Sequence, residues 1–433
     1  MDDLTIHSFF TCNARISTVN GSIITAPLKL SFVGERCFLY RSLQSSKPIG
    51  QAETIGLAHD GVTLSLLGSP GGISLSDVVV PSGNAFSIPL NHSLSGCIID
   101  CEGRVRQRFG ETSVTGETLT TLRPIISFPP DFSERRPIRE IFQTGIRVID
   151  SLLTCGVGQR IGIFAGAGAG KTSLMSMIIN HSKADVYVIG LVGERGREVT
   201  EFLADGIPEN KRANTVIVYS TSDRPAVERR NAALIATTIA EYFRDEGKSV
   251  VLMVDSMTRY ARALRDVALS AGEMPARRGY PASVFDELPR ILERSGATHR
   301  GSITAFYTVL LEEEDDVDPI GDEIRSILDG HIYLSRKLGG KGHFPAIDVL
   351  RSASRVVSSI CEPEQLKQAA KIREYIARLE ELQLMVDLGE YTPGENVETD
   401  KIINKRPAIE KFVKQAMHER TDFVETLEML HAI

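Results

Sequence analysis

Residues 161–173 have the sequence IGIFAGAGAGKTS, and the rest of the chain is organised around them. The apolar start predicts a buried strand, the small residues predict a turn, and a helix is expected to begin near Lys171. A strand, a glycine-rich loop and a helix in this order form a cradle for phosphates. Backbone N–H groups and the positive end of the helix dipole then face the anion. The stretch therefore predicts a P-loop.

This loop predicts a nucleotide site. Lys171 can reach the β and γ phosphates, and the Thr172 hydroxyl can ligate Mg²⁺. The strict P-loop pattern begins with glycine, where this chain has Ala165. That is a mild departure, because the crowded positions are the later glycines. The residues expected to bind nucleotide are Gly166, Ala167, Gly168, Ala169, Gly170, Lys171, Thr172 and Ser173. The alternative is a flexible glycine turn with an incidental Lys-Thr pair.

Two acidic residues are expected at the same edge of the sheet as the P-loop. Asp255 ends an apolar run, so its carboxylate can hold Mg²⁺ directly or through water. Glu194 follows another apolar run and can polarise the attacking water, while Arg195 beside it can contact the γ phosphate. The alternatives are a strand-end aspartate that caps a turn and an ion-pair turn within residues 193–198.

The surrounding pattern predicts an α/β domain between two other domains. Apolar runs alternate with helix-length segments, which is typical of a parallel sheet covered on both faces. The runs are 161–164, 186–192, 215–220, 249–255 and 302–310. Short apolar runs before residue 85 predict a small β-barrel or sandwich. An extended connection over residues 86–150 is predicted by prolines that break regular structure, namely Pro124, Pro129, Pro130 and Pro137. Apolar residues near helical spacing after Glu362, with charged residues between them, predict helices. The expected domains are 1–87, 88–361 and 362–433.

Composition argues against several classes of protein. The 433 residues carry a formal net charge of -7, and no tract is dominated by Lys and Arg, which disfavours a nucleic-acid partner. Six scattered cysteines predict reduced thiols. The N-terminus lacks the basic and apolar segments of a secretory signal, and no stretch reaches the about 18 apolar residues of a membrane span. A cytoplasmic protein is therefore expected.

Beyond the P-loop, long ungapped strings resemble the type III secretion ATPases. That family is related to the flagellar export ATPases and to the catalytic subunits of rotary ATP synthases. The strings are GERGRE (193–198), TSDRPAVER (221–229), VDSMTRYARALRD (254–266), GSITAFYTVL (301–310) and GHFPAID (342–348). The resemblance covers about residues 88–361. Segments 147–171 and 346–355 look more like the virulence-type injectisome than the flagellar branch.

The resemblance implies a fold, an activity and partners. A RecA-like P-loop domain would lie between a β-barrel that serves oligomerisation or docking and a C-terminal helical domain. The enzyme would hydrolyse ATP to ADP and phosphate, to release chaperones and unfold proteins for export. It would form a homohexamer with stator and central-stalk proteins, the export gate and chaperone–effector complexes, and no nucleic acid. The ring would lie at the cytoplasmic face of the bacterial inner membrane.

The resemblance also implies roles for the P-loop residues and the strand-end acids. Glu194 matches the family's catalytic carboxylate, and Arg195 matches the arginine beside it. Lys171 and Thr172 match the P-loop pair, so Lys171 would be catalytic and Thr172 would ligate Mg²⁺. Asp255 matches the acid of the second motif and would be the other Mg²⁺ ligand.

Two further residues acquire a role only through the resemblance. Arg355 matches an arginine finger that reaches into a neighbouring subunit's site and would be catalytic there. Phe344 matches an aromatic side chain that stacks on adenine. By themselves, Arg355 would be interpreted as a surface arginine and Phe344 as a core aromatic.

Other functions are alternatives to a secretion ATPase. A flagellar export ATPase shares most of the motifs, and a rotary ATP synthase or vacuolar-type subunit would need a second, distinct chain in its ring. A nucleic-acid motor would hold single strands on aromatic platforms, whereas this chain has no Trp and few aromatics before residue 85. A non-catalytic nucleotide-binding subunit often lacks the acid found here at Glu194.

Overall fold

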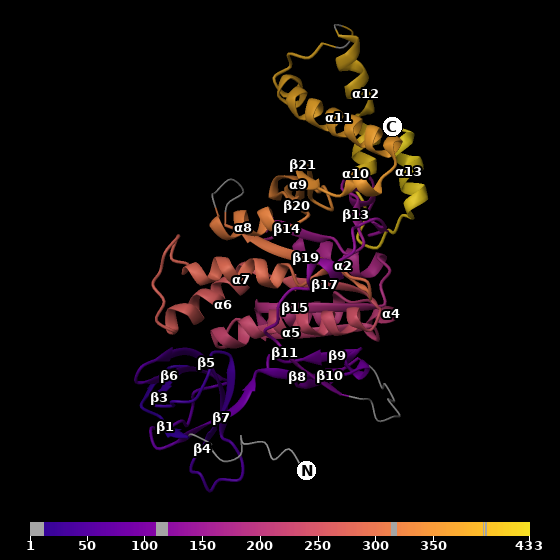
Figure 1. Ribbon diagram of the computed structural model, residues 1–433. Helices are drawn as coiled ribbons and strands as arrows, with labels where there is room; N and C mark the ends of the chain where they lie inside the picture. Colours follow the sequence, from indigo (N-terminus) through magenta and orange to yellow (C-terminus); the bar gives the residue numbers. More distant parts are fainter. Residues whose placement is uncertain (1–12, 110–119, 313–317, 393, 395) are drawn as a thin grey trace.

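The computed structural model describes residues 13–109, 120–312, 318–392, 394 and 396–433 (Figure 1). The N-terminal residues 1–12, on which the expectation of no secretory signal rests, lie outside this range. Figure 1 shows three parts along one axis: a β-sheet unit at the bottom, an α/β layer in the middle and a helical part at the top. No helix in the described ranges combines the length and the apolar character needed to cross a membrane.

The N-terminal part is an antiparallel sheet in the order β1-β7-β4-β5-β6-β3-β2. Its strands are β1 (Ala14–Arg15), β2 (Thr18–Asn20), β3 (Ile23–Ala26), β4 (Glu35–Tyr40), β5 (Gly50–Ala58), β6 (Gly61–Leu67) and β7 (Val78–Ala85). Cys37 and Leu39 alternate with more exposed neighbours, so one face of the sheet packs into a core of its own. No pairing joins β1 to β2 within the described residues, so the expected barrel is confirmed as a half-barrel.

The segment between residues 86 and 150 differs from the extended connection that the sequence predicts. It contains β8 (Ser87–Leu90), the 3₁₀ turn η2 (His92–Leu94), β9 (Cys97–Ile99), β10 (Val105–Arg108), β11 (Thr121–Pro124), the 3₁₀ turn η3 (Phe132–Glu134), β12 (Ile141–Phe142) and α1 (Arg147–Leu152). Strand β9 pairs in parallel with a strand of the central sheet, and β10 pairs with β9. The connection is therefore part of the sheet, because Ile98 and Ile99 bury their side chains on opposite faces of it.

The central sheet has the order β10-β9-β16-β15-β17-β19-β14-β20-β21, with β18 attached to β19. Its strands after β10 are β14 (Arg160–Gly166), β15 (Val186–Glu194), β16 (Thr215–Thr221), β17 (Ser249–Asp255), β18 (Gly296–Ala297), β19 (Ser302–Leu311), β20 (Gly330–Leu334) and β21 (Ile347–Ser354), while β12 pairs separately with β13 (Cys155–Gly156). In this spatial order, neighbouring strands from β9 to β20 pair in parallel. The outermost strands, β10 and β21, pair antiparallel to their neighbours. All the predicted apolar runs are strands of this sheet, as a doubly covered sheet requires.

Helices cover both faces of the sheet. They are α2 (Lys171–His181), α3 (Gly196–Asp205), α4 (Glu209–Arg212), α5 (Ala226–Asp245), α6 (Met257–Ser270), α7 (Ala282–Leu292), α8 (Pro319–Ile327), α9 (Arg336–Gly340) and α10 (Val357–Ile360). Successive residues of β15 enter different cores. Val188 packs with the α5–α8 side, whereas Ile189 packs with the α1–α3 side. This arrangement leaves the carboxyl ends of the parallel strands as a common edge, where ligands bind in such sheets.

The C-terminal part consists of α11 (Pro363–Asp387), α12 (Val397–Val413) and α13 (Phe423–His431). Ile372, Phe412 and Leu430 extend the same core that α1 and α2 line. The buried Arg147 of α1 holds the two parts together, since its Nε donates to the Phe412 carbonyl at 3.1 Å. The helical part is therefore joined directly to the layer that carries the P-loop.

Candidate active site

The P-loop connects the end of β14 to the start of α2. Gly168 and Gly170 have φ values of 76° and 90°, a left-handed conformation that favours glycine. A side chain on Gly166 would stand 2.5 Å from Nε of Arg336, so the Arg336 guanidinium would have to move to admit one. Ala165 is buried inside β14 between two neighbouring strands, where a methyl group fits. The departure from the strict pattern thus falls on a strand position rather than in the loop.

Lys171, Asp255 and Glu194 meet at the carboxyl edge of the sheet. Nζ of Lys171 lies 2.5 Å from Oδ1 of Asp255 and 3.7 Å from Oε1 of Glu194. Thr308 of β19 donates its hydroxyl to Asp255 Oδ1 at 2.8 Å. Glu194 and Asp255 are each only 5% exposed. The end of β15, the end of β17 and the first residue of α2 therefore place two carboxylates and one ammonium group in a largely buried site.

Glu194 has an unusual electrostatic environment. Burial raises its pKa to about 8, the charge of Asp255 and a hydrogen bond with Glu198 add to the rise, and the charges of Lys171 and Arg259 oppose it. Nη2 of Arg259 lies 3.0 Å from Glu194 Oε2. Glu194 Oε1 is buried and accepts no hydrogen bond from the residues that the structure describes. A buried carboxyl oxygen that accepts no hydrogen bond is suited to bind a water or a ligand group.

Lys171, Glu194 and Asp255 line a cavity of about 440 Å³. One wall is the first turn of α2, with Lys171, Thr172 and Ser173. Other walls are the ends of β15 and β17 and one face of α3. Met417, from the segment between α12 and α13, closes a further side. The cavity therefore has the hydroxyl, ammonium and carboxylate groups that a magnesium–nucleotide complex requires.

Phe344 and Arg195 lie differently with respect to this cavity. Phe344 is half exposed, and its ring stands 4.0 Å from the position a Cβ on Gly170 would take, so it lies beside the P-loop. Arg195 has a side chain that is 77% exposed and pairs with Glu198 at 3.4 Å. Its guanidinium is thus directed to solvent at the rim in this structure.

Arg355 lies beside the amino ends of the parallel strands, whereas the P-loop follows the carboxyl end of β14. Its backbone N–H donates to the Asp329 carbonyl, and the Asp329 N–H donates to Arg160 at the start of β14. The seven residues of β14 then separate it from the loop, a span of about 20 Å at about 3.3 Å per residue. One chain therefore brings together all the predicted site residues except Arg355, with Arg195 at the rim. The residues brought together are Gly166, Ala167, Gly168, Ala169, Gly170, Lys171, Thr172, Ser173, Glu194, Asp255 and Phe344.

Among the residues that contact this site, sequence reasoning missed Arg259, Arg336, Thr308 and Met417. Arg259 lies in the first turn of α6, four residues after Asp255, and that spacing after a strand-end acid is a signal that could have identified it. Thr308 is a polar residue inside an apolar strand, which is a weaker signal. Arg336 and Met417 reach the site only through packing, and the residues around them carry no signal.

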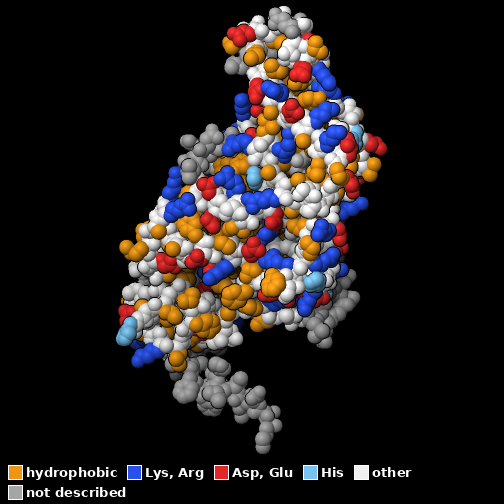
Figure 2. Space-filling model, turned by 45° about the horizontal axis from the view of Figure 1, so that its top comes forward, with side chains coloured by type: hydrophobic (Ala, Val, Ile, Leu, Met, Phe, Trp, Pro, Cys, Tyr) orange, Lys and Arg blue, Asp and Glu red, His pale blue; other side chains and the backbone are white. Residues whose placement is uncertain are grey.

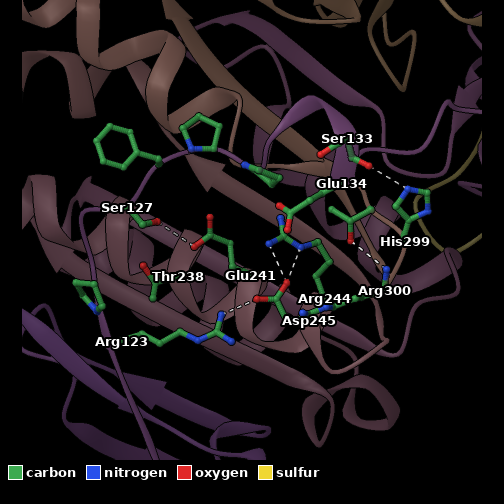
Figure 3. A pocket seen from close by; sticks show the side chains of 15 residues that line it. Arg123, Ser127, Ser133, Glu134, Thr238, Glu241, Arg244, Asp245, His299 and Arg300 are labelled. Atoms are coloured by element: carbon green, nitrogen blue, oxygen red, sulfur yellow. Dashed lines mark hydrogen bonds and ion pairs between the residues drawn. The ribbon is translucent and has the colours of Figure 1, made fainter.

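A second cavity, of about 490 Å³, lies near the amino ends of β17 and β19, at the far edge of the sheet (Figure 3). Its two carboxylates on α5 already have partners. Asp245 accepts from Arg123 at 2.7 Å and from Arg244 at 2.9 Å, and Glu241 accepts from Arg294 at 2.6 Å. Paired charges of this kind stabilise structure, whereas the cavity beside the P-loop contains the buried Glu194 oxygen without a hydrogen bond, so that cavity is the candidate active site.

Comparisons with known proteins agree with this location. Residues 145–354 match the model of the ATP synthase alpha/beta family, nucleotide-binding domain. Residues 361–432 match the model of the T3SS EscN ATPase C-terminal domain. The first match contains the whole P-loop cavity except Met417, and the second contains Met417.

Relatives extend over nearly the whole chain. The SPI-1 type 3 secretion system ATPase of Salmonella typhi is 52% identical over 96% of this chain and 95% of its own length. The flagellum-specific ATP synthase of Bacillus subtilis is 42% identical over 97% of this chain and 94% of its own.

Solved structures agree in three dimensions. The assembled ATPase EscN of the enteropathogenic E. coli type III secretion system has a TM-score of 0.88 at 45% identity, covering 97% of this chain and 99% of EscN. The chain belongs to the type III secretion system ATPases of the ATP synthase alpha/beta family, enzymes that drive protein secretion and are related to the flagellar ATPases.

Proposed function

We propose that ATP is hydrolysed in the cavity beside the P-loop and that Glu194 is the catalytic carboxylate. The observation that carries this proposal is the Glu194 side chain itself, which is buried, accepts no hydrogen bond on Oε1 from the described residues and lies 3.7 Å from the P-loop lysine. Such a group can hold and orient the attacking water. Burial raises the pKa of Glu194 to about 8, and the nearby positive charges of Lys171 and Arg259 oppose that rise and favour the basic form.

Thr172 and Asp255 would hold Mg²⁺. A hydroxyl on the first turn of a helix and a buried carboxylate at a strand end are oxygen donors of the kind this ion takes when it also binds phosphates. The ion supplies charge neutralisation to the β and γ phosphates. In this structure the Lys171 ammonium group neutralises Asp255, so we expect Lys171 to exchange that partner for the phosphates when nucleotide binds.

Arg195, Arg355 and Phe344 would complete the site. The P-loop amides of residues 166–173 would cradle the phosphates, and the Phe344 ring would stack on adenine. Arg195 would turn from Glu198 toward the γ phosphate. Arg355 would act on the site of a neighbouring copy, because its own P-loop is at the other edge of the sheet. A head-to-tail ring is the closed assembly that places the two edges against each other, and we propose a homohexamer.

We also propose the wider role that the family implies. The three domains, 1–87 for oligomerisation or docking, 88–361 for hydrolysis and 362–433 as a helical domain, would work in a ring at the cytoplasmic face of the inner membrane. The ring would release chaperones and unfold exported proteins. A solved complex of EscN with its central stalk EscO, which this chain resembles at a TM-score of 0.86, supports a stalk partner. Stator proteins, the export gate and chaperone–effector complexes would be the others.

Nucleic acid is not among the proposed partners. On the face shown in Figure 2, Lys and Arg side chains are interspersed with Asp and Glu side chains rather than gathered in one basic field. Sequence-independent binding of nucleic acid depends on such a field. An ATPase rate unchanged by added RNA would support this part of the proposal.

The test of the ring model is specific activity against protein concentration. Phosphate release is measured over a dilution series, and molecular mass is measured in parallel with a non-hydrolysable ATP analogue. We expect activity per chain to rise with the fraction of protein in a six-chain assembly. Full activity in a sample that remains monomeric would contradict the shared-site model.

A further inference from the structure

The segment 414–421, here called the C-terminal strap, joins α12 to α13 and passes beside the nucleotide cavity. Met417 of the strap lines that cavity. The Arg147 guanidinium anchors the strap to α1, since Nη1 donates to the Thr421 hydroxyl at 3.0 Å. The strap therefore belongs to the C-terminal helical part by sequence and to the active site by position.

Gln415 is the most completely hydrogen-bonded side chain of the strap. It is only 4% exposed. Its Oε1 accepts the Arg147 backbone N–H at 2.8 Å, and its Nε2 donates to the carbonyls of Gly145 at 2.8 Å and Glu419 at 2.7 Å. The Arg147 N–H belongs to the first turn of α1, where helix donors lack partners within the helix. One amide thus fixes the strap against the start of α1.

The backbone of Gln415 makes the contact that reaches the nucleotide site. Its N–H donates to the Phe344 carbonyl at 2.9 Å. Phe344 is 50% exposed, so packing constrains it only in part. Its ring nevertheless lies beside Gly170 of the P-loop. The orientation of Phe344 relative to the P-loop therefore depends on where the strap holds the Gln415 N–H.

We propose that Gln415 is a positioning residue for the adenine end of the site and acts through Phe344. This inference rests on the proposed stacking of adenine on Phe344. The phosphate end is independent of Gln415, because Lys171, Thr172 and the P-loop are set by β14 and α2. Loss of the Gln415 amide frees the strap to shift against α1 and widens the range of orientations of Phe344. Binding of the base then weakens, while binding of the phosphates does not.

The test compares a ligand that has a base with one that lacks it. Affinities for a non-hydrolysable ATP analogue and for inorganic tripolyphosphate, both with Mg²⁺, are measured by calorimetry on wild-type protein and on Gln415→Ala. We expect about tenfold weaker binding of the ATP analogue, the effect of about one net hydrogen bond, and unchanged binding of tripolyphosphate. In steady state, KM for ATP should rise by a similar factor while kcat changes less than about twofold.

Gln365→Ala is the matched control. Gln365 is equally buried, belongs to the same helical part, and donates from Nε2 to the Thr154 hydroxyl at 2.9 Å and to carbonyls of α1. Its removal loosens the same domain contact at a place away from Phe344. We expect a similar fall in Tm for both variants, with the ratio of the two affinities changed only in Gln415→Ala.

Phe344→Ala separates failure of this inference from failure of the proposed function. If Phe344→Ala loses affinity for the ATP analogue alone and Gln415→Ala behaves as wild type, the positioning role is refuted and the stacking role stands. Should Phe344→Ala leave both affinities unchanged, the stacking role is refuted, and the positioning role with it. Equal loss of both ligands in Gln415→Ala refutes the positioning role by showing a general structural effect. In the double variant, the two losses should not add.

A second variant keeps the test valid if Gln415→Ala is unstable. Gln415→Glu preserves size and the acceptor for Arg147 but places carboxylate oxygen against the carbonyls of Gly145 and Glu419. The same selective loss of affinity for the ATP analogue is expected. Wild-type affinity for both ligands in this variant would contradict the proposal.

Discussion

The ammonium group of Lys171 lies 2.5 Å from Oδ1 of Asp255, so the P-loop lysine and the carboxylate that ends β17 neutralise each other. Both side chains are largely buried. The Thr308 hydroxyl holds the same Asp255 oxygen at 2.8 Å and fixes the carboxylate in place. The pair thus keeps a strong negative charge from standing alone in a low-dielectric cavity, and it has to separate when phosphates arrive.

Replacing Lys171 with Ala should abolish hydrolysis and also destabilise the nucleotide-free protein. Loss of the ammonium leaves Asp255 and Glu194 without a close lysine, and removal of one partner from a buried pair costs on the order of 3 kcal/mol. Phosphate release tests the first effect and urea unfolding tests the second. Arg195→Ala is the control for stability, since its exposed ion pair with Glu198 is worth less than about 1 kcal/mol. Normal turnover by Lys171→Ala would refute the P-loop assignment.

Replacing Glu194 with Gln should separate binding from hydrolysis. The amide has nearly the same shape, so the cavity can still admit nucleotide, but it cannot accept the proton of the attacking water. We expect turnover to fall by about 100-fold or more, the usual contribution of a positioned base. Equilibrium binding of an ATP analogue and single-turnover phosphate release are measured for wild-type protein and for Glu194→Gln, and the two proteins are compared. Turnover within a few fold of wild type would remove Glu194 from the catalytic role.

The raised pKa of Glu194 predicts a pH dependence of stability. Between the ordinary value of 4.5 and the folded value of about 8, the native state holds a proton that the unfolded chain releases. The free energy of unfolding attributable to this group therefore falls as pH rises through that window, with a slope of up to about 1.4 kcal/mol per pH unit.

Urea unfolding of nucleotide-free protein at pH 5, 6, 7 and 8 measures this effect against Glu194→Gln, which lacks the titrating group. The stability of the variant relative to wild type should increase steadily toward pH 8 and level off above it. Parallel stability curves for the two proteins would show that Glu194 titrates near its ordinary value.

Replacing Arg355 with Ala should preserve nucleotide binding and remove the activity that depends on assembly. Because the arginine of one copy would serve the site of another, two inactive variants can complement each other. A copy with Lys171→Ala still supplies Arg355, and a copy with Arg355→Ala still supplies an intact P-loop cavity. We expect mixtures of these two variants to regain a measurable fraction of wild-type phosphate release.

A mixture of Lys171→Ala with Glu194→Gln is the control for complementation. Both changes lie in one cavity of one chain, so no copy in that mixture supplies an intact cavity and activity should stay absent. If the Arg355→Ala mixture were equally inactive while mass measurements showed mixed rings, the trans-acting role of Arg355 would be wrong.

Local sequence patterns were sufficient to predict the α/β domain and the positions of most residues of its candidate site. Continuous apolar runs predict strands buried on both faces, and an acid at the end of such a run lies at the carboxyl edge of a parallel sheet. The positions of Lys171, Glu194 and Asp255 follow from these rules, because each is set by the element that contains it. Glycine at residues 168 and 170 likewise reflects a backbone conformation that the loop itself requires.

Relationships between distant segments emerged only from the tertiary structure. Residues 86–150 contribute β9 and β10 to the central sheet, although their prolines suggested an extended connection. Arg355 lies at the edge opposite the P-loop because β21 runs antiparallel to β20. Gln415 caps the start of α1 from 268 residues away. Such contacts depend on how complete elements pack against one another, and packing is decided by the whole core rather than by the residues on either side of a position.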